Sequence, residues 1–352
     1  MIHIFDRNYY RYYGRILVKN DIVYLGFTNS KVDFYIKGDS NKDTIITAQI
    51  SSKASREEDY ARLRVYVDDV LYTKEPIVLF NKEQEIYPIA TLKDGKEHKI
   101  SIIKITEAQM SYAAFHDIFI ENGTLLHLPK DTDNRIKMEF IGDSITCGYG
   151  VHGAPMSEFH IREEDGEITY AALAAKELNL NARYTAVSGH GVYCEYTGNT
   201  EGTLPRIYRY TNWWADPDER YDFHDFTPEL VVINLGTNDS RFFEESEEAQ
   251  KGFTEKFITA YIDFLKFIRS KYPNAKLLCM CGTLATQPFS RIEKACNMMK
   301  ESGMKDIYTL ELPFHDVEHD GMASQHPSAI THQKDAKRLI AKIKEILPEL
   351  AE

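Results

Sequence analysis

Four residues between positions 144 and 326 combine the groups that nucleophilic attack on a carbonyl carbon requires. Ser144 carries a hydroxyl, which is a weak nucleophile until a neighbouring base removes its proton. The imidazole of His326 could be that base. Gly189 would let a backbone N–H approach a ligand closely. The amide of Asn238 could donate to a developing oxyanion, an interaction that lowers the barrier by about 3 kcal/mol.

Each of these residues also has an ordinary structural explanation. Asp143 and Ser144 could cap a helix, and Gly189 and Asn238 could lie in plain turns. A lone histidine is more often structural than catalytic. All four residues, however, stand in order along the chain, each at the boundary of an expected element. Capping hardly explains this joint pattern, so we predict that the four residues act together.

The elements expected around these residues are those of a parallel sheet with helices on both faces. Short apolar runs indicate buried strands over residues 136–141, 230–235 and 277–281. Apolar residues at three- and four-residue steps indicate helices over residues 170–180, 253–272, 291–300 and 329–347. Strands that alternate with helices form parallel sheets. Such folds place their chemistry at the carboxyl ends of the strands.

The first part of the chain has a different periodicity. Short segments rich in β-branched and aromatic residues, separated by polar turns, indicate strands over residues 16–18, 32–36, 44–48, 63–67 and 99–103. No long helical pattern lies between them, which favours a β-sandwich of jelly-roll type. We therefore expect a sandwich domain over residues 1–130 and an α/β domain over residues 131–352.

The four segments around the candidate residues resemble those of the SGNH (GDSL-type) hydrolase superfamily. The Gly142-Asp143-Ser144 block, a glycine in the second block, the Gly-Thr-Asn-Asp third block and the late histidine match its pattern over about residues 136–347. There is no Gly-x-Ser-x-Gly elbow, so the chain is not an ordinary α/β-hydrolase. With the sandwich included, residues 104–108, 141–150 and 326–328 resemble carbohydrate esterase family 2.

This resemblance implies a fold, an activity and a role for each residue. The fold would be an SGNH-type three-layer α/β/α hydrolase domain with a parallel sheet, which follows the sandwich domain in the chain. The activity would be removal of acetyl groups from acetylated xylan or mannan oligosaccharides. Ser144 would be the nucleophile and His326 the general base. The oxyanion hole would consist of the N–H groups of Ser144 and Gly189 and the side-chain amide of Asn238.

One catalytic position departs from the superfamily pattern. Many SGNH enzymes have Asp three residues before the histidine, where this chain has Ala323. Either a Ser–His dyad operates, or another group orients the imidazole. A backbone carbonyl from residues 323–324 could do so. Asp320 is the best carboxylate candidate and Asp316 a poorer one.

Aromatic residues near the blocks are candidates for substrate binding. Tyr149 and Tyr193 follow the first two blocks and could line the acyl or sugar pocket. Trp213 and Trp214 lie in a polar stretch and could form a stacking platform for a sugar. Packing in a core is the ordinary alternative for all four rings.

Composition and charge exclude several classes of partner. The formal net charge of −12 makes nucleic acid and anionic membranes unsuitable partners. The sequence contains no run of about eighteen apolar residues, the length needed to span a membrane. The start of the chain has no basic head followed by an apolar run, and five scattered cysteines form no disulfide framework, so we expect a cytoplasmic protein. We expect no cofactor, and the sequence leaves the oligomeric state open.

Three alternatives to this enzyme stay open. His315 and His319 have a spacing that can bind zinc on a helix, which would suit a metal-dependent deacetylase, although a solvated polar turn explains them better and we expect no metal. A general carboxylesterase or lipase-type esterase could use the same fold. The polar residues over 149–166 favour a polar substrate instead. The third alternative is a carbohydrate-binding protein that has lost its activity.

Overall fold

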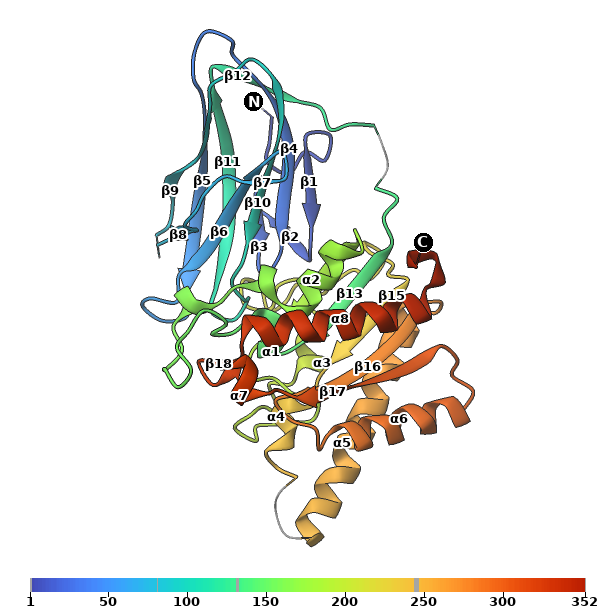
Figure 1. Ribbon diagram of the computed structural model, residues 1–352. Coiled ribbons are helices and arrows are strands. Elements are labelled where there is room, and N and C mark those ends of the chain that lie inside the picture. Colours follow the sequence, from blue (N-terminus) through green and yellow to red (C-terminus); the bar gives the residue numbers. More distant parts are fainter. Residues whose placement is uncertain (1, 81, 131–132, 244–246, 352) are drawn as a thin grey trace. The chain divides into compact units, whose positions relative to one another are not determined.

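The chain folds into two compact units. The computed structural model describes residues 2–80, 82–130, 133–243 and 247–351, with side chains from residue 252 onward in the last range (Figure 1). The first unit comprises residues 1–134 and 211–219, and the second comprises residues 135–210 and 220–352. The predicted boundary after residue 130 thus lies close to the observed one, but residues 211–219 group with the first unit.

The first unit contains two antiparallel sheets. One has the order β1 (Tyr10–Tyr13), β4 (Lys31–Gly38), β10 (Glu97–Lys104), β6 (Ala61–Val67) and β7 (Val70–Leu71), while β12 (Gly123–Leu126) pairs with β4 and β8 (Ile77–Leu79) pairs with β6. The other has the order β2 (Ile16–Lys19), β3 (Ile22–Leu25), β11 (Ser111–Glu121), β5 (Thr44–Ala54) and β9 (Glu85–Leu92). All five strands predicted in this region are confirmed.

The two sheets share one core because their inward residues alternate with outward ones. Phe34 and Ile36 of β4 are fully buried, as are Ile46 and Ala48 of β5 in the other sheet, and all four belong to one apolar cluster. Full burial of a side chain such as Phe34 stabilises the fold by about 2–3 kcal/mol. The alternation of buried and outward residues along strands such as β5 is that of a sandwich with its core between the sheets.

Residues 211–219 come from the second half of the sequence but fold with the sandwich. The ring of Trp213 stacks on Phe27, with 6.4 Å between ring centroids and 20° between planes. The Asp216 carboxylate forms an ion pair with Lys19, the last residue of β2. Our expectation that residues 131–352 form one domain missed this excursion, because the contacts that hold it are long-range.

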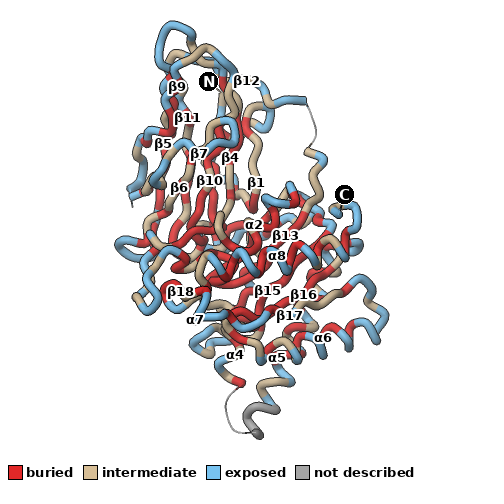
Figure 2. The backbone as a smooth tube through the Cα atoms, viewed as in Figure 1, coloured by how far each residue is buried: buried red, intermediate tan, exposed pale blue. Residues whose placement is uncertain are grey.

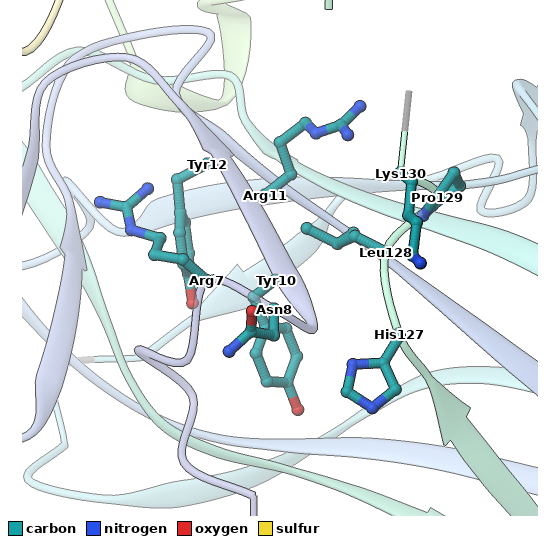
Figure 3. Close-up of a pocket in the computed structure, with 9 residues that line it drawn as sticks. All are labelled: Arg7, Asn8, Tyr10, Arg11, Tyr12, His127, Leu128, Pro129 and Lys130. Atoms are coloured by element: carbon teal, nitrogen blue, oxygen red, sulfur yellow. The ribbon is translucent and has the colours of Figure 1, made fainter. Parts of the chain in front are cut away.

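The first unit also carries an open pocket of about 520 Å³ beside β1 (Figure 3). Its lining includes three basic side chains, those of Arg7, Arg11 and Lys130. The Arg7 guanidinium lies 4.9 Å from the ring centroid of Tyr12, a cation–π distance. None of the predicted site residues lines this pocket.

The second unit is built on a five-stranded parallel sheet. Its order is β14 (Asn181–Ala186), β13 (Lys137–Gly142), β15 (Leu230–Asn234), β16 (Lys276–Thr283) and β17 (Ile307–Phe314). The three central strands were predicted, and the two edge strands were not assigned. β14 contains Asn181, Arg183 and Thr185. As an edge strand it lacks the continuous apolar run by which a central strand is recognised in the sequence.

Helices cover both faces of this sheet. The helices α2 (Tyr170–Glu177) and α8 (Ala329–Ile346) share an apolar cluster with β13, β15 and β16. The helices α5 (Glu247–Lys271) and α6 (Phe289–Glu301) pack against each other on the other face, where α6 contacts β16 and β17. Figure 2 shows buried residues along the central strands. The predicted three-layer α/β/α architecture is confirmed.

Short elements connect these layers and carry the polar residues of interest. They are α1 (Ser144–Cys147), α3 (Leu204–Ile207), α4 (Thr237–Ser240), α7 (Val317–Asp320), the two-residue strands β18 (Met322–Ala323) and β19 (His326–Pro327), and the 3₁₀ turns Ile161–Glu163, Gly166–Ile168 and Pro348–Leu350. Within the described residues, every helix is too short or too polar to cross a bilayer.

The packing of β16 against its helices gives a stability prediction. Leu278 is fully buried in the core cluster, so Leu278→Ala should lower the free energy of unfolding by about 2–5 kcal/mol. Met298→Ala on α6 is the control, because that side chain is 44% exposed and its loss should change stability little. Denaturant unfolding followed by circular dichroism measures both. Equal effects of the two substitutions would contradict the assigned core.

Candidate active site

The order of the parallel strands brings three of the candidate segments to one edge. β13 lies between β14 and β15, so the carboxyl ends of these three strands are neighbours. Ser144 follows β13, Gly189 follows β14 and Asn238 follows β15. The strand that follows β13 in the chain, β14, lies on one side of it, and the later strands lie on the other side. Open α/β sheets bind ligands where the order of strands switches sides in this way.

The candidate nucleophile and base are in hydrogen-bonding contact. Ser144 opens the short helix α1, where the Asp143 side chain caps the turn by accepting the Ile145 N–H at 3.1 Å. His326 Nε2 lies 3.0 Å from Ser144 Oγ. This distance suits transfer of the hydroxyl proton to the imidazole.

A tight hairpin orients His326 from its other nitrogen. Ala323 of β18 pairs with His326 of β19, and the connecting residues Ser324 and Gln325 have φ values of 46° and 61°. Two left-handed residues in sequence are the signature of a type I′ hairpin turn. In this turn the Ser324 carbonyl oxygen lies 3.2 Å from His326 Nδ1.

Asp320, the carboxylate candidate for this role, is engaged elsewhere. Its Oδ1 lies 2.5 Å from Lys334 Nζ on α8. Its backbone carbonyl accepts a hydrogen bond of 2.7 Å from Ser328 Oγ, the N-cap side chain of α8. Of the orienting groups that the sequence left open, the structure therefore brings the Ser324 carbonyl to the imidazole.

Burial keeps the imidazole neutral. Desolvation of the ring lowers the pKa of His326 to about 4, the hydrogen bond to the Ser324 carbonyl opposes this shift, and the neighbouring His315 adds to it. A carbonyl can only accept, so we assign the proton of the neutral ring to Nδ1. Nε2 then presents its lone pair to the Ser144 hydroxyl.

The candidate oxyanion donors of Gly189 and Asn238 follow β14 and β15, the two strands next to β13. Gly189 has a φ of +79°, a left-handed conformation that few other residues adopt without strain. The Asn238 side-chain nitrogen lies 3.3 Å from both Asp143 Oδ2 and the His190 carbonyl. The amide therefore links the segment that carries Ser144 to the segment that carries Gly189.

Asp239 fixes the turn after Gly189, a role that we did not predict. Its fully buried carboxylate accepts the N–H groups of Val192, Tyr193 and Cys194 at 2.8–3.0 Å. Burial raises the pKa of Asp239 to about 6, and these three hydrogen bonds oppose the shift. The only signal in the sequence is its position next to Asn238 directly beyond an apolar strand.

Of the predicted aromatic residues, Tyr149 lies against His326. Its ring centroid is 4.5 Å from that of His326, and Phe159 stacks on Tyr149 at 3.6 Å. Tyr193 instead packs edge-on against Phe253 of α5. Trp213 and Trp214 belong to the first unit, where Trp213 stacks on Phe27 and Trp214 is 36% exposed.

The two histidines considered for zinc have different environments. His315 was expected in a solvated polar turn, but it follows β17 at the carboxyl edge of the sheet and is only 6% exposed. His319 is exposed and pairs with Asp316 at 2.9 Å. Across the described ranges, no group of three or more His, Cys, Asp or Glu side chains has an arrangement that could hold a metal ion.

Comparison with known families agrees with this architecture. Residues 140–334 match the model of the GDSL-like Lipase/Acylhydrolase family, which covers more than half of the chain. Residues 12–129, which form most of the sandwich, match the Carbohydrate esterase 2 N-terminal family.

Individual relatives are similar over most of this chain. The cellulase/esterase CelE of Acetivibrio thermocellus is 35% identical over 263 residues, 73% of this chain but only 31% of CelE, so the chain spans less than a third of that relative. An acetylxylan esterase / glucomannan deacetylase of Cellvibrio japonicus is 27% identical over 82% of this chain and 79% of its own length. The solved structure of a family two carbohydrate esterase from Clostridium thermocellum, in complex with cellohexaose, has a TM-score of 0.84 and 29% identity and covers 96% of this chain and 99% of that one. The chain therefore belongs to the GDSL-like lipase/acylhydrolase family of carboxylic ester hydrolases, and its N-terminal domain is of the carbohydrate esterase 2 type.

Proposed function

We propose that the protein is a serine carbohydrate O-acetylesterase that removes acetyl groups from acetylated xylan or mannan oligosaccharides. The observation that carries the proposal is the 3.0 Å contact between Ser144 Oγ and a neutral His326 whose other nitrogen is occupied by a carbonyl. The substrate class is supported by the relative named for activity on acetylxylan and glucomannan.

Acylation would begin with transfer of the Ser144 proton to His326 Nε2. The serine oxygen attacks the acetyl carbonyl carbon, and the carbonyl π electrons move onto its oxygen. The N–H groups of Ser144 and Gly189 and the Asn238 amide would donate to this oxyanion. When the tetrahedral intermediate collapses, the bond to the sugar oxygen breaks and His326 returns its proton to that oxygen. The products are a deacetylated sugar and acetyl-Ser144.

Deacylation would repeat the same steps with water as the nucleophile. His326 Nε2 accepts a proton from water, and the hydroxide adds to the acetyl carbonyl. Collapse of the second intermediate releases acetic acid, which ionises to acetate in solution, and the proton on His326 returns to Ser144 Oγ. The reaction consumes one water and regenerates both side chains, so the residues of this chain account for every proton.

The polar loop after Ser144 gives less support to a polar substrate than the sequence suggested. Asp165 is fully buried and lies 2.9 Å from His152 Nε2, and Glu164 is also buried. Glu163 hydrogen-bonds Ser324. These side chains maintain the shape of the loop, so the preference for a carbohydrate rests on the relatives.

The proposal is tested by measuring acetate release from acetylated xylo- and manno-oligosaccharides with chelator present. The wild-type protein should release acetate, and Ser144→Ala should lower kcat by more than about 1,000-fold because no nucleophile remains. Ser302→Ala, at the end of α6, is the matched control and should behave like wild type. Sugar binding by folded wild-type protein without acetate release would overturn the proposal in favour of a binding function.

The low pKa of His326 predicts an unusual acid limit. Only neutral His326 can accept the serine proton, so kcat/KM should stay level from pH 7 downward and fall about tenfold per pH unit only below a pKa of about 4. Unfolded His326 binds protons more readily than the folded form, so acid also destabilises the fold. Circular dichroism at each pH identifies the range in which the protein stays folded. An acid limb near pH 6.5 would contradict the assigned environment.

A further inference from the structure

The hairpin turn that orients His326 is held from outside by the loop that follows Ser144. The Ser324 N–H donates to the Ala154 carbonyl at 2.8 Å, and the Gln325 N–H donates to the Pro155 carbonyl at 3.0 Å. Both donors belong to the two left-handed turn residues. The loop therefore fixes the backbone of the turn through two hydrogen bonds.

The Glu163 carboxylate also holds the turn, by accepting a hydrogen bond from the side chain of Ser324. Ser324 is almost fully buried, and its Oγ donates to Glu163 Oε2 at 3.0 Å. The same oxygen accepts the backbone N–H of His160 at 3.3 Å, and the Glu163 carbonyl accepts the His152 N–H at 3.0 Å. Glu163 is thereby fixed within its loop at the end of the 3₁₀ turn Ile161–Glu163.

The contact between Ser324 and Glu163 is possible because residue 153 of the loop is a glycine. A Cβ atom at Gly153 would lie 1.9 Å from Ser324 Oγ and 2.8 Å from Glu163 Oε2. Neither distance is sterically allowed, so any larger residue at position 153 would push the serine hydroxyl and the carboxylate apart. The close approach of loop and turn is thus part of the local structure around the hydrogen bond.

We propose that Glu163 is a positioning residue for the esterase reaction, acting on His326 through Ser324. By accepting the hydrogen bond from Ser324 Oγ, it holds the turn in the orientation that directs the Ser324 carbonyl to His326 Nδ1. In many superfamily members a carboxylate lies against the imidazole itself. Here the carboxylate acts on the imidazole indirectly, through Ser324. This inference rests on the proposed function, in which His326 is the general base.

The kinetic test compares variants that remove one end of this hydrogen bond. Glu163→Ala and Ser324→Ala should each lower kcat for acetate release by about 10–100-fold with little change in KM, because a misplaced base slows proton transfer without removing substrate contacts. The double variant should be no slower than either single one, since both act through the same contact. Glu163→Gln retains an acceptor oxygen and should recover activity to within a few-fold of wild type.

Ser157→Ala is the matched control. Ser157 Oγ lies 3.1 Å from Ser324 Oγ but donates to the Ala154 carbonyl, so its removal leaves the Glu163 contact in place and should preserve wild-type kcat. Multiplicative losses in the double variant would overturn the proposal. So would a Glu163→Gln variant as slow as Glu163→Ala, or a Glu163→Ala variant as fast as the control.

A measurement without substrate separates this inference from the proposed function. In ¹⁵N-histidine-labelled protein, the His326 Nδ1–H should give a slowly exchanging downfield signal, because it is held on the Ser324 carbonyl. That signal should broaden or disappear in Glu163→Ala and persist in Glu163→Gln and Ser157→Ala, all compared under conditions where circular dichroism shows them folded. An unchanged signal in Glu163→Ala would refute the positioning role whether or not the protein releases acetate.

Discussion

The contact between Ser144 Oγ and His326 Nε2 joins residues 182 positions apart, and much of the second unit is arranged to maintain it. The parallel sheet fixes the serine end, because β13 ends directly before α1 and its capping aspartate. The histidine end depends on a two-residue turn between short strands, followed by the Ser328 cap of α8. A rigid sheet edge and a braced hairpin therefore define the position of one proton.

Orientation of the imidazole by a carbonyl has an electrostatic consequence. Hydrogen bonds to ionised groups are about twice as strong as those between neutral groups, so a carboxylate would stabilise the imidazolium and raise the pKa of the histidine. Here burial dominates and the pKa of His326 falls to about 4. The base is thus available at neutral pH but weak. In the proposed reaction, stabilisation of the oxyanion by preorganised donors must then contribute a large share of the rate enhancement.

Sequence patterns predicted those parts of the fold in which the residue types of a segment match its burial in the folded chain. The central strands β13, β15 and β16 are buried on both faces, so their apolar runs were visible, whereas the edge strands β14 and β17 mix polar and apolar residues. Ser144 and Asn238 were identifiable because they follow predicted strands, and Gly189 because it lies in the second of the four sequence blocks. Asp239 and Glu163 were not, because their roles arise from contacts with residues 45–47 and 161 positions away. Residues 211–219 escaped assignment for the same reason.

The central claim is that neutral His326 activates Ser144 as a nucleophile, and covalent labelling tests it most directly. Diethyl p-nitrophenyl phosphate phosphorylates activated serines regardless of sugar specificity, and intact-protein and peptide mass spectrometry locate the adduct. The account predicts one diethylphosphoryl group, located on Ser144, that forms much more slowly in His326→Ala. Labelling at another residue, or an equal rate in the histidine variant, would contradict it.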